Sequence, residues 1–218
     1  MYDSLINVNG DQVATLDILL LLTIIALLPS ILIMMTSFMR TVIILSFLRT
    51  AMGVQQTPPN MVLAGIAVFL TLFIMDPVIA EINTEAYTPY KNQEITQEEA
   101  IERAQVPLKR FMLENTEKDS LELFADMANA EAVEDVQDLP LTVVVPSFMT
   151  SELKRAFSAG FLLYIPFLLI DVVVSSTLMS MGMMMLPPAM ISMPFKLLLF
   201  VSVDGWGLLF STIVNSFQ

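Results

Sequence analysis

The chain has 218 residues, of which 56% are hydrophobic and only 15% are charged, so its composition excludes an ordinary soluble domain. It contains no cysteine and no histidine, which excludes disulfides, thiol nucleophiles, histidine-based triads and Cys/His metal sites. Its formal net charge of −12 argues against nucleic acid as a partner, because neutralising phosphates requires basic patches. We therefore expect an all-α, membrane-associated protein that needs neither a cofactor nor a metal.

Residues 1–80 predict an N-terminal hairpin of two helical arms. Residues 1–17 are acidic and lack the basic region of a signal peptide. Residues 18–39 are uncharged and long enough to cross about 30 Å of hydrocarbon as one helix, kinked at Pro29. A polar break with two prolines follows at 52–60. Residues 61–75 form the second apolar run, which Asp76-Pro77 interrupts before Val78-Ile79-Ala80.

Two arginines, Arg40 and Arg49, lie in or beside the first connection between these arms. Short loops rich in Lys and Arg face the cytoplasm, so this connection is expected there and the N-terminus outside. Lys154 and Arg155 fit that orientation poorly, although the loop before them is long and the rule applies to short loops.

Residues 81–150 predict a small, mostly helical extracytoplasmic insert. The segment from Val78 to Thr150 holds fifteen acidic and five basic residues, a charge of −10. Thr96-Gln97-Glu98-Glu99 has the form of a capping box and predicts a helix start, and 119–122 predicts a second start. Residues 139–146, LPLTVVVP, are β-branched and bracketed by prolines, so we expect an extended segment there.

Residues 151–218 predict a C-terminal hairpin. Thr150-Ser151-Glu152 is expected to cap its first arm, which runs to Ser180 with Pro166 inside it, and the second arm covers 195–217. With the N-terminal arms, this gives about four long, kinked hydrophobic helices that form hairpins. Both termini are expected on one side.

A methionine-rich loop at 181–188 separates the two C-terminal arms. Pro187 and Pro188 interrupt any helix there, so the residues before them should lie on a bend. Irregular backbone at membrane depth survives only where it is buried in protein or lines an aqueous cavity. Methionine is flexible and adapts to varied shapes, so such a loop would make a compliant seal. Gap-filling in a helical core is the plainer alternative. The loop's residues of interest are Gly182, Met183, Met184, Met185, Pro187 and Pro188.

Four charged residues stand in or against apolar runs, where an exposed charge costs roughly 2.5 to 3.5 kcal/mol. They lack evident partners along their own arms, so pairing with neighbouring subunits is favoured, and a cation or proton path is the alternative. Lys196 and Asp204 are eight residues apart, which places them on one face of a single helix. These residues, counted with Arg40 as buried or interface charges, are Arg49, Asp171, Lys196 and Asp204.

From Leu20 onward the chain closely resembles the FliP family of flagellar type III export-gate subunits. Among the stretches that carry the resemblance are SFMRTVIILSFLRTAMGVQQTPPNM, PLKRFMLENTEKDSLELFADMA and STLMSMGMMMLPPAMISMPFK. The virulence (injectisome) branch is similar, but the LPP after the methionines and the long acidic insert resemble the flagellar branch. The match departs at the N-terminus, where many relatives carry a cleavable signal sequence.

The resemblance implies five copies that assemble with FliQ and FliR into a pore for unfolded flagellar substrates. It also implies a periplasmic insert, a place in the bacterial inner membrane and flagellar basal body, and a pore-closing methionine gasket at Met183, Met184 and Met185. The subunit is expected to be non-enzymatic, and because no Walker-type glycine-rich loop is present, the energy for export is expected to come from elsewhere. The alternatives are a small ion-coupled transporter that uses Asp171, Lys196 and Asp204, or, more weakly, an intramembrane aspartyl hydrolase.

Overall fold

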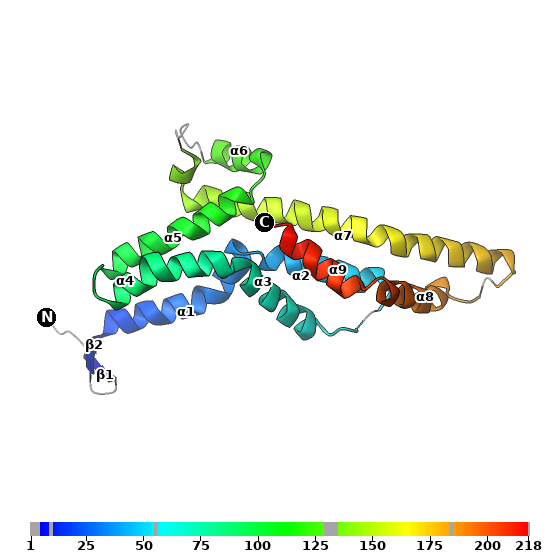
Figure 1. Cartoon of the computed structure of the whole chain (residues 1–218), viewed down its shortest axis with the longest axis horizontal. Coiled ribbons are helices and arrows are strands. Elements are labelled where there is room, and N and C mark those ends of the chain that lie inside the picture. Colours follow the sequence, from blue (N-terminus) through cyan, green and yellow to red (C-terminus); the bar gives the residue numbers. More distant parts are fainter. Residues whose placement is uncertain (1–4, 9–10, 55, 129–134, 184, 218) are drawn as a thin grey trace.

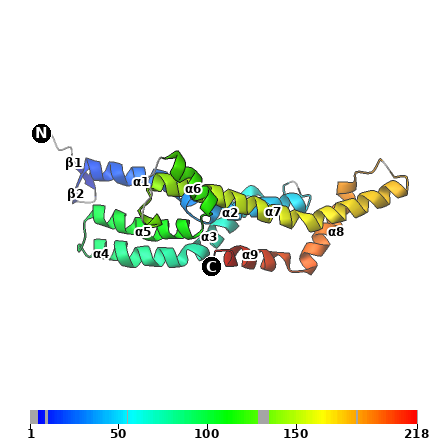
Figure 2. The same ribbon diagram turned by 90° about the horizontal axis from the view of Figure 1, so that it is seen from above.

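The computed structural model describes residues 5–8, 11–54, 56–128, 135–183 and 185–217, and almost all of them are helical, as predicted. The molecule is elongated, with the β-hairpin and α4 at one end and the α7–α8 connection at the other (Figures 1 and 2). The elements in chain order are β1 (Leu5–Val8), β2 (Asp11–Ala14), α1 (Thr15–Met35), α2 (Phe38–Ala51), α3 (Asn60–Ile82), the π-helical η1 (Asn83–Tyr87), α4 (Thr88–Lys91), α5 (Gln97–Glu114), α6 (Lys118–Met127), the 3-10 segment η2 (Val136–Asp138), α7 (Leu141–Ser180), α8 (Pro188–Ser202) and α9 (Gly205–Asn215).

Two stretches of helix are long and apolar enough to cross a membrane, Asn60–Lys91 and Leu141–Ser180. Two bent helix pairs raise the number of candidate spans to four if each pair counts as one span. Both counts refer to the described part of the chain. The expectation of about four long, kinked arms therefore corresponds to two long helices and two broken ones.

The first arm is not one helix, contrary to the sequence prediction. Helix α1 passes through Pro29 and ends at Met35, and α2 starts at Phe38. The segment Pro29–Met35 meets α2 at 79°. The hydroxyl of Thr36 accepts a hydrogen bond from the amide of Phe38 (3.3 Å), which satisfies one free donor at the start of α2. The apolar run at 18–39 therefore contains a sharp bend that its composition does not indicate.

The second arm extends beyond its predicted end. Helix α3 continues through Asp76-Pro77, and the helical path runs on through η1 and α4 to Lys91. The boundary expected at residue 81 therefore falls inside a continuous helical stretch. Pro77 costs one backbone hydrogen bond, and η1 provides the wider turn that lets the helix continue against α5.

The acidic insert contains the two predicted helices. The capping box is present: the Thr96 side chain accepts from the Glu99 amide, and the Glu99 carboxylate accepts from the Thr96 amide at 2.9 Å. Phe111 and Met112 of α5 are buried against the core, so this end of the helix packs on the rest of the molecule. Helix α6 begins at Lys118, one residue before the predicted start.

Residues 139–146 are not extended, which corrects the sequence prediction. Helix α7 begins at Leu141 and continues unbroken to Ser180, so Thr150-Ser151-Glu152 lies inside it rather than at its start. Pro140 is compatible with a helix start, and Pro146 lies in the second turn. The buried residues Val143, Val144, Ser147 and Phe148 recur at helical spacing, so packing overrides β propensity here.

The core forms where α2 packs lengthwise against α7 and α3 (Figure 1). Leu45, Leu48, Val144 and Phe148 are buried at this contact. The helices approach closely at Gly160, where an added Cβ would lie 2.5 Å from Cγ of Phe47. Glycine is therefore required there for α2 and α7 to meet.

The last arm is also broken. Helices α8 and α9 meet at 65°, and Asp204, between them, takes a left-handed conformation with φ of 50°. A Cβ on Gly205 would lie 2.3 Å from the Phe200 ring, so the joint packs closely as well. Lys196 and Asp204 therefore lie on different sides of a helix break, and the expectation that they share one helical face is wrong.

Candidate functional site

The methionine loop lies at the far end of the molecule, between α7 and α8 (Figures 1 and 2). The chain leaves α7 through Gly182, whose φ of +74° favours glycine, and the Met183 amide donates to the Leu178 carbonyl at 3.0 Å. Pro187 precedes α8, and Pro188 is its first residue, where a missing amide proton costs nothing. The bend predicted between two helical arms is confirmed.

The loop presents methionine side chains to its surroundings instead of burying them in its own chain. Met185 is 99% exposed and Met183 is 40% exposed. Met184 lies outside the described residues. Packing within the subunit therefore does not explain Met185, although it was the plainer interpretation of the sequence. An exposed apolar loop at the tip of an apolar hairpin has the chemistry of a contact or a seal.

Behind the loop, a polar network joins α8 to α7 and α2. The Lys196 ammonium donates to Asp171 Oδ2 at 2.6 Å and to the Ala51 carbonyl at 3.0 Å. The Ser192 hydroxyl donates to the other carboxylate oxygen of Asp171 at 2.6 Å. Ala51 ends α2, so the ammonium also lies at the negative end of that helix dipole. The network fixes the base of the hairpin that carries the methionine loop.

These charges lack evident partners along their own arms and were expected to pair with neighbouring subunits, but three of them have partners elsewhere in the same chain. Asp171 and Lys196 pair with each other, which leaves neither an uncompensated charge. Arg49 connects the end of α2 to the start of α3. Its guanidinium donates to Asn60 Oδ1 and to the Pro58 carbonyl, the latter at 3.4 Å. Asp204 is exposed beyond the end of α8. The three charges of the transporter alternative therefore do not converge on one site.

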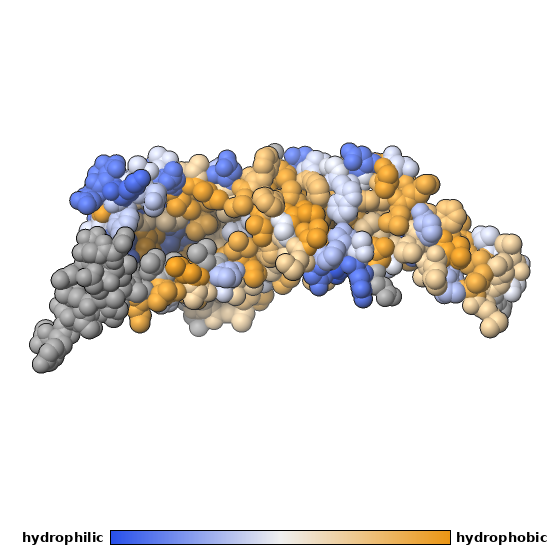
Figure 3. All heavy atoms as spheres, turned by 90° about the horizontal axis from the view of Figure 1, so that it is seen from below, coloured by the Kyte–Doolittle hydropathy of each residue, from blue (hydrophilic) through white to orange (hydrophobic). Residues whose placement is uncertain are grey.

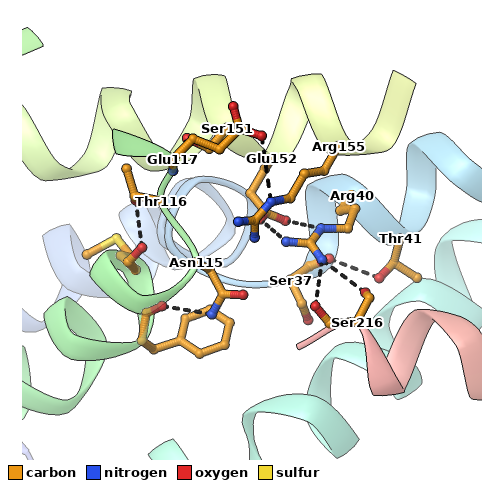
Figure 4. A network of polar contacts seen from close by, with 12 residues as sticks. Ser37, Arg40, Thr41, Asn115, Thr116, Glu117, Ser151, Glu152, Arg155 and Ser216 are labelled. Atoms are coloured by element: carbon orange, nitrogen blue, oxygen red, sulfur yellow. Dashed lines mark hydrogen bonds and ion pairs between the residues drawn. The ribbon is translucent and has the colours of Figure 1, made fainter. Parts of the chain in front are cut away.

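Arg40 occupies a second polar junction, together with Glu152 and Ser216 (Figure 4). It forms an ion pair with Glu152 of α7 and donates from Nε to Glu152 Oε2 at 2.8 Å. It also donates from Nη1 to the Ser216 carbonyl at 3.2 Å and hydroxyl at 2.9 Å, and its guanidinium carbon lies 3.6 Å from the centroid of the Phe217 ring. One side chain thus holds α2, α7 and the segment after α9 together.

Glu152 was missed as a functional partner by sequence reasoning, which assigned it to a helix cap. It is completely buried, and burial of a carboxylate requires a paired charge. The only sequence signal was the placement of Arg40 and Glu152 in mainly apolar surroundings, which does not reveal a contact across more than a hundred residues. Among the described residues, no three acidic side chains are grouped closely enough to hold a metal ion.

Much of the surface around these junctions is apolar. Figure 3 shows hydrophobic side chains spread over one face of the molecule, well beyond what a soluble monomer exposes. Large exposed side chains line both long helices, including Phe69 and Phe73 of α3 and Phe161, Leu162 and Val173 of α7. Such a surface requires lipid, partner subunits or both.

Comparison with known proteins agrees with these features. The FliP family model matches residues 21–213. Flagellar biosynthetic protein FliP of Bacillus subtilis is 53% identical over 204 residues, which cover 94% of this chain and 92% of that protein. The FliP proteins of Aquifex aeolicus and Pectobacterium carotovorum are each 50% identical, with 96% of this chain covered and 89% and 82% of those proteins. The chain therefore belongs to the FliP family of flagellar biosynthetic proteins.

Proposed function

We propose that the chain is a core subunit of the flagellar type III export gate in the bacterial inner membrane, at the flagellar basal body. Five copies would assemble with FliQ and FliR around a pore that conducts unfolded flagellar substrates. Residues 81–150 would lie on the periplasmic side. The subunit would act as a conduit without enzymatic chemistry, and the energy for transport would come from other components.

The observation that carries this proposal is the position of the methionine loop. It ends a long apolar hairpin, and Met185 is fully exposed while the hairpin base is fixed by the Asp171–Lys196 network. Copies arranged around an axis would bring their loops together into one apolar constriction. Flexible thioether side chains would close this constriction at rest and repack around a passing chain.

Cysteine cross-linking tests whether the loops converge. The chain has no cysteine, so Met185→Cys introduces a single thiol. In assembled particles, mild oxidation should link neighbouring subunits through this position. The matched control is Val201→Cys in α8, which is 75% exposed but lies on the other side of the Lys196 network. A Met185→Cys protein that assembles normally but gives no more cross-links than Val201→Cys would contradict convergence.

A further inference from the structure

An apolar groove of about 1030 Å³, separate from the methionine loop, runs between α7 and α9. Residues of α2 and of the end of α8 line its back. Its walls are mostly leucine, isoleucine and phenylalanine side chains, including Leu163 and Phe167 from α7 and Leu209 and Ile213 from α9. An apolar cavity with a few polar groups at one place is the usual form of a small-ligand site.

The polar groups of the groove gather at one end, by the Arg40 junction (Figure 4). Arg155, Glu114 and Asn115 line this end, together with Ser216. The remaining charges nearby are paired: Arg40 with Glu152, and Lys154 with Glu117 at 2.9 Å. The groove is therefore apolar along its length, and its mouth carries Arg155 and Glu114 beside the paired Arg40.

Arg155 is the side chain at the mouth with capacity to bind a ligand. Within the described residues its one ion pair is with Glu117, at 3.9 Å, and its side chain is 34% exposed. A guanidinium carries five N–H donors in a planar fork that matches a phosphate group. Glu114 adds a carboxylate that accepts hydrogen bonds from an ammonium group.

The length of the groove selects the kind of apolar group that fits. Along α7 it extends from Arg155 to Phe167, which at 1.5 Å per residue is roughly 18 Å. Half of a bilayer's hydrocarbon core is about 15 Å. An extended acyl chain of similar length would therefore fit along the groove, with the head group at the Arg155 end.

We propose that this groove binds a zwitterionic phospholipid that carries a primary ammonium group, such as phosphatidylethanolamine. An acyl chain lies between α7 and α9, Arg155 binds the phosphate, and Glu114 binds the ammonium. The opposite charges at the mouth favour this head group over phosphatidylglycerol, which offers a phosphate without a cation. The guanidinium fork of Arg155 matches the phosphate, and the added carboxylate of Glu114 supplies the selectivity.

The test uses the assembled complex in nanodiscs and phosphatidylethanolamine or phosphatidylglycerol with a diazirine in one acyl chain. Phosphatidylethanolamine should label groove peptides that contain Leu163 and Leu209, and more strongly than phosphatidylglycerol does. Arg155→Gln should lower this labelling about threefold to fivefold, as for the loss of one partly exposed charge contact. Glu114→Gln should remove the preference for phosphatidylethanolamine over phosphatidylglycerol. Lys118→Gln, which removes an exposed cation of α6 that does not line the groove, is the control and should change nothing.

A second variant blocks the groove without altering its charges. Thr212 is exposed and lines the groove, so Thr212→Trp fills it from the solvent side of α9 and should abolish labelling at Leu163. If a charge variant fails to assemble, the proposal is tested on the unaltered protein, by comparing how strongly the two lipids label the groove peptides. Equal labelling by both lipids contradicts the proposal. So does a photoreactive residue at Leu163 that cross-links to protein instead of lipid, because a neighbouring subunit then fills the groove.

Discussion

Arg40 and Glu152, 112 positions apart in the sequence, form a buried ion pair that joins α2 to α7. The same arginine also holds Ser216 and the ring of Phe217, so the pair links the start of the core to the end of the chain. A buried pair is not by itself evidence of extra stability, because desolvating two charges offsets their attraction. Removing only one of the two charges is strongly destabilising, however, because it leaves the other charge buried without a partner.

Arg40→Met should destabilise the protein by about 3–5 kcal/mol, because it leaves the Glu152 carboxylate buried without a counter-charge. Unfolding by denaturant in detergent, followed by circular dichroism, measures this loss. The control is the double variant Arg40→Met/Glu152→Leu, which removes both charges and should recover most of the stability. A single variant within about 1 kcal/mol of the wild type would contradict the role of the pair.

Lys196→Glu should release the base of the methionine hairpin, because it places two carboxylates together at Asp171. The cost should approach roughly 3 kcal/mol, reduced somewhat because the Asp171 side chain is 30% exposed. Protease sensitivity of the α7–α8 connection and the yield of assembled particles report the effect. The swapped pair Asp171→Lys/Lys196→Glu restores the charge match but not the bond to the Ala51 carbonyl, so it should recover part of the yield. No recovery would mean that the pair does not act within one subunit.

Gly160→Ala should cost about 1–3 kcal/mol, since the new methyl group meets the Phe47 ring and forces α2 and α7 apart. Gly65→Ala in α3 is the matched control. Nothing lies within 4 Å of its added Cβ, so alanine should stabilise the helix by roughly 0.5–1 kcal/mol. Thermal unfolding of both variants in the same detergent compares them. Equal shifts would show that the contact at Gly160 carries no strain.

Asn92→Cys should react with a membrane-impermeant thiol reagent in intact spheroplasts. The residue is exposed in the turn between α4 and α5, inside the segment that carries the charge of −10. Met112→Cys is the control, because Met112 is completely buried and should stay unlabelled in the folded protein. Labelling of Asn92→Cys only after lysis would place the acidic insert in the cytoplasm and reverse the expected orientation.

Local signals in the sequence predicted the local features correctly. The Thr96–Glu99 capping box starts α5, and the glycine and two prolines around the methionines separate α7 from α8. Both features depend on residues close together in the chain, so local backbone geometry and hydrogen bonding determine them. Prolines were weaker guides inside helices, because Pro77 and Pro146 both lie within continuous helix. Buried residues flank Pro146 on both sides, whereas the buried residues of α3 all precede Pro77.

The features that the sequence did not predict depend on distant contacts. The bend between Met35 and Phe38 contains no proline or glycine, and the partner of Arg40 lies in another helix. Lys196 was expected to face another subunit, because nothing along its own arm marks Asp171 as the neighbour that α7 brings to it. Only the packed arrangement of helices determines the pairings of Arg40 and Lys196. The short β1–β2 hairpin was also not anticipated, although its pairing is local and the Asn-Gly at positions 9 and 10 is a hairpin signal.

The ion conductance of the assembled complex in a lipid bilayer tests the central proposal, a pore closed by methionines, most directly. Replacing Met183, Met184 and Met185 together by alanine should leave the assembly intact but leaky, because short side chains cannot fill an apolar constriction. The unaltered complex should be ion-tight under the same conditions. Alanine substitution at Met179 of α7 and Met190 of α8, which are exposed on the helices that flank the loop, controls for general loss of methionine. The account predicts that conductance rises in the triple-alanine variant and not in the control variant. An intact triple-alanine complex that remains ion-tight would contradict the proposal that these methionines close the pore.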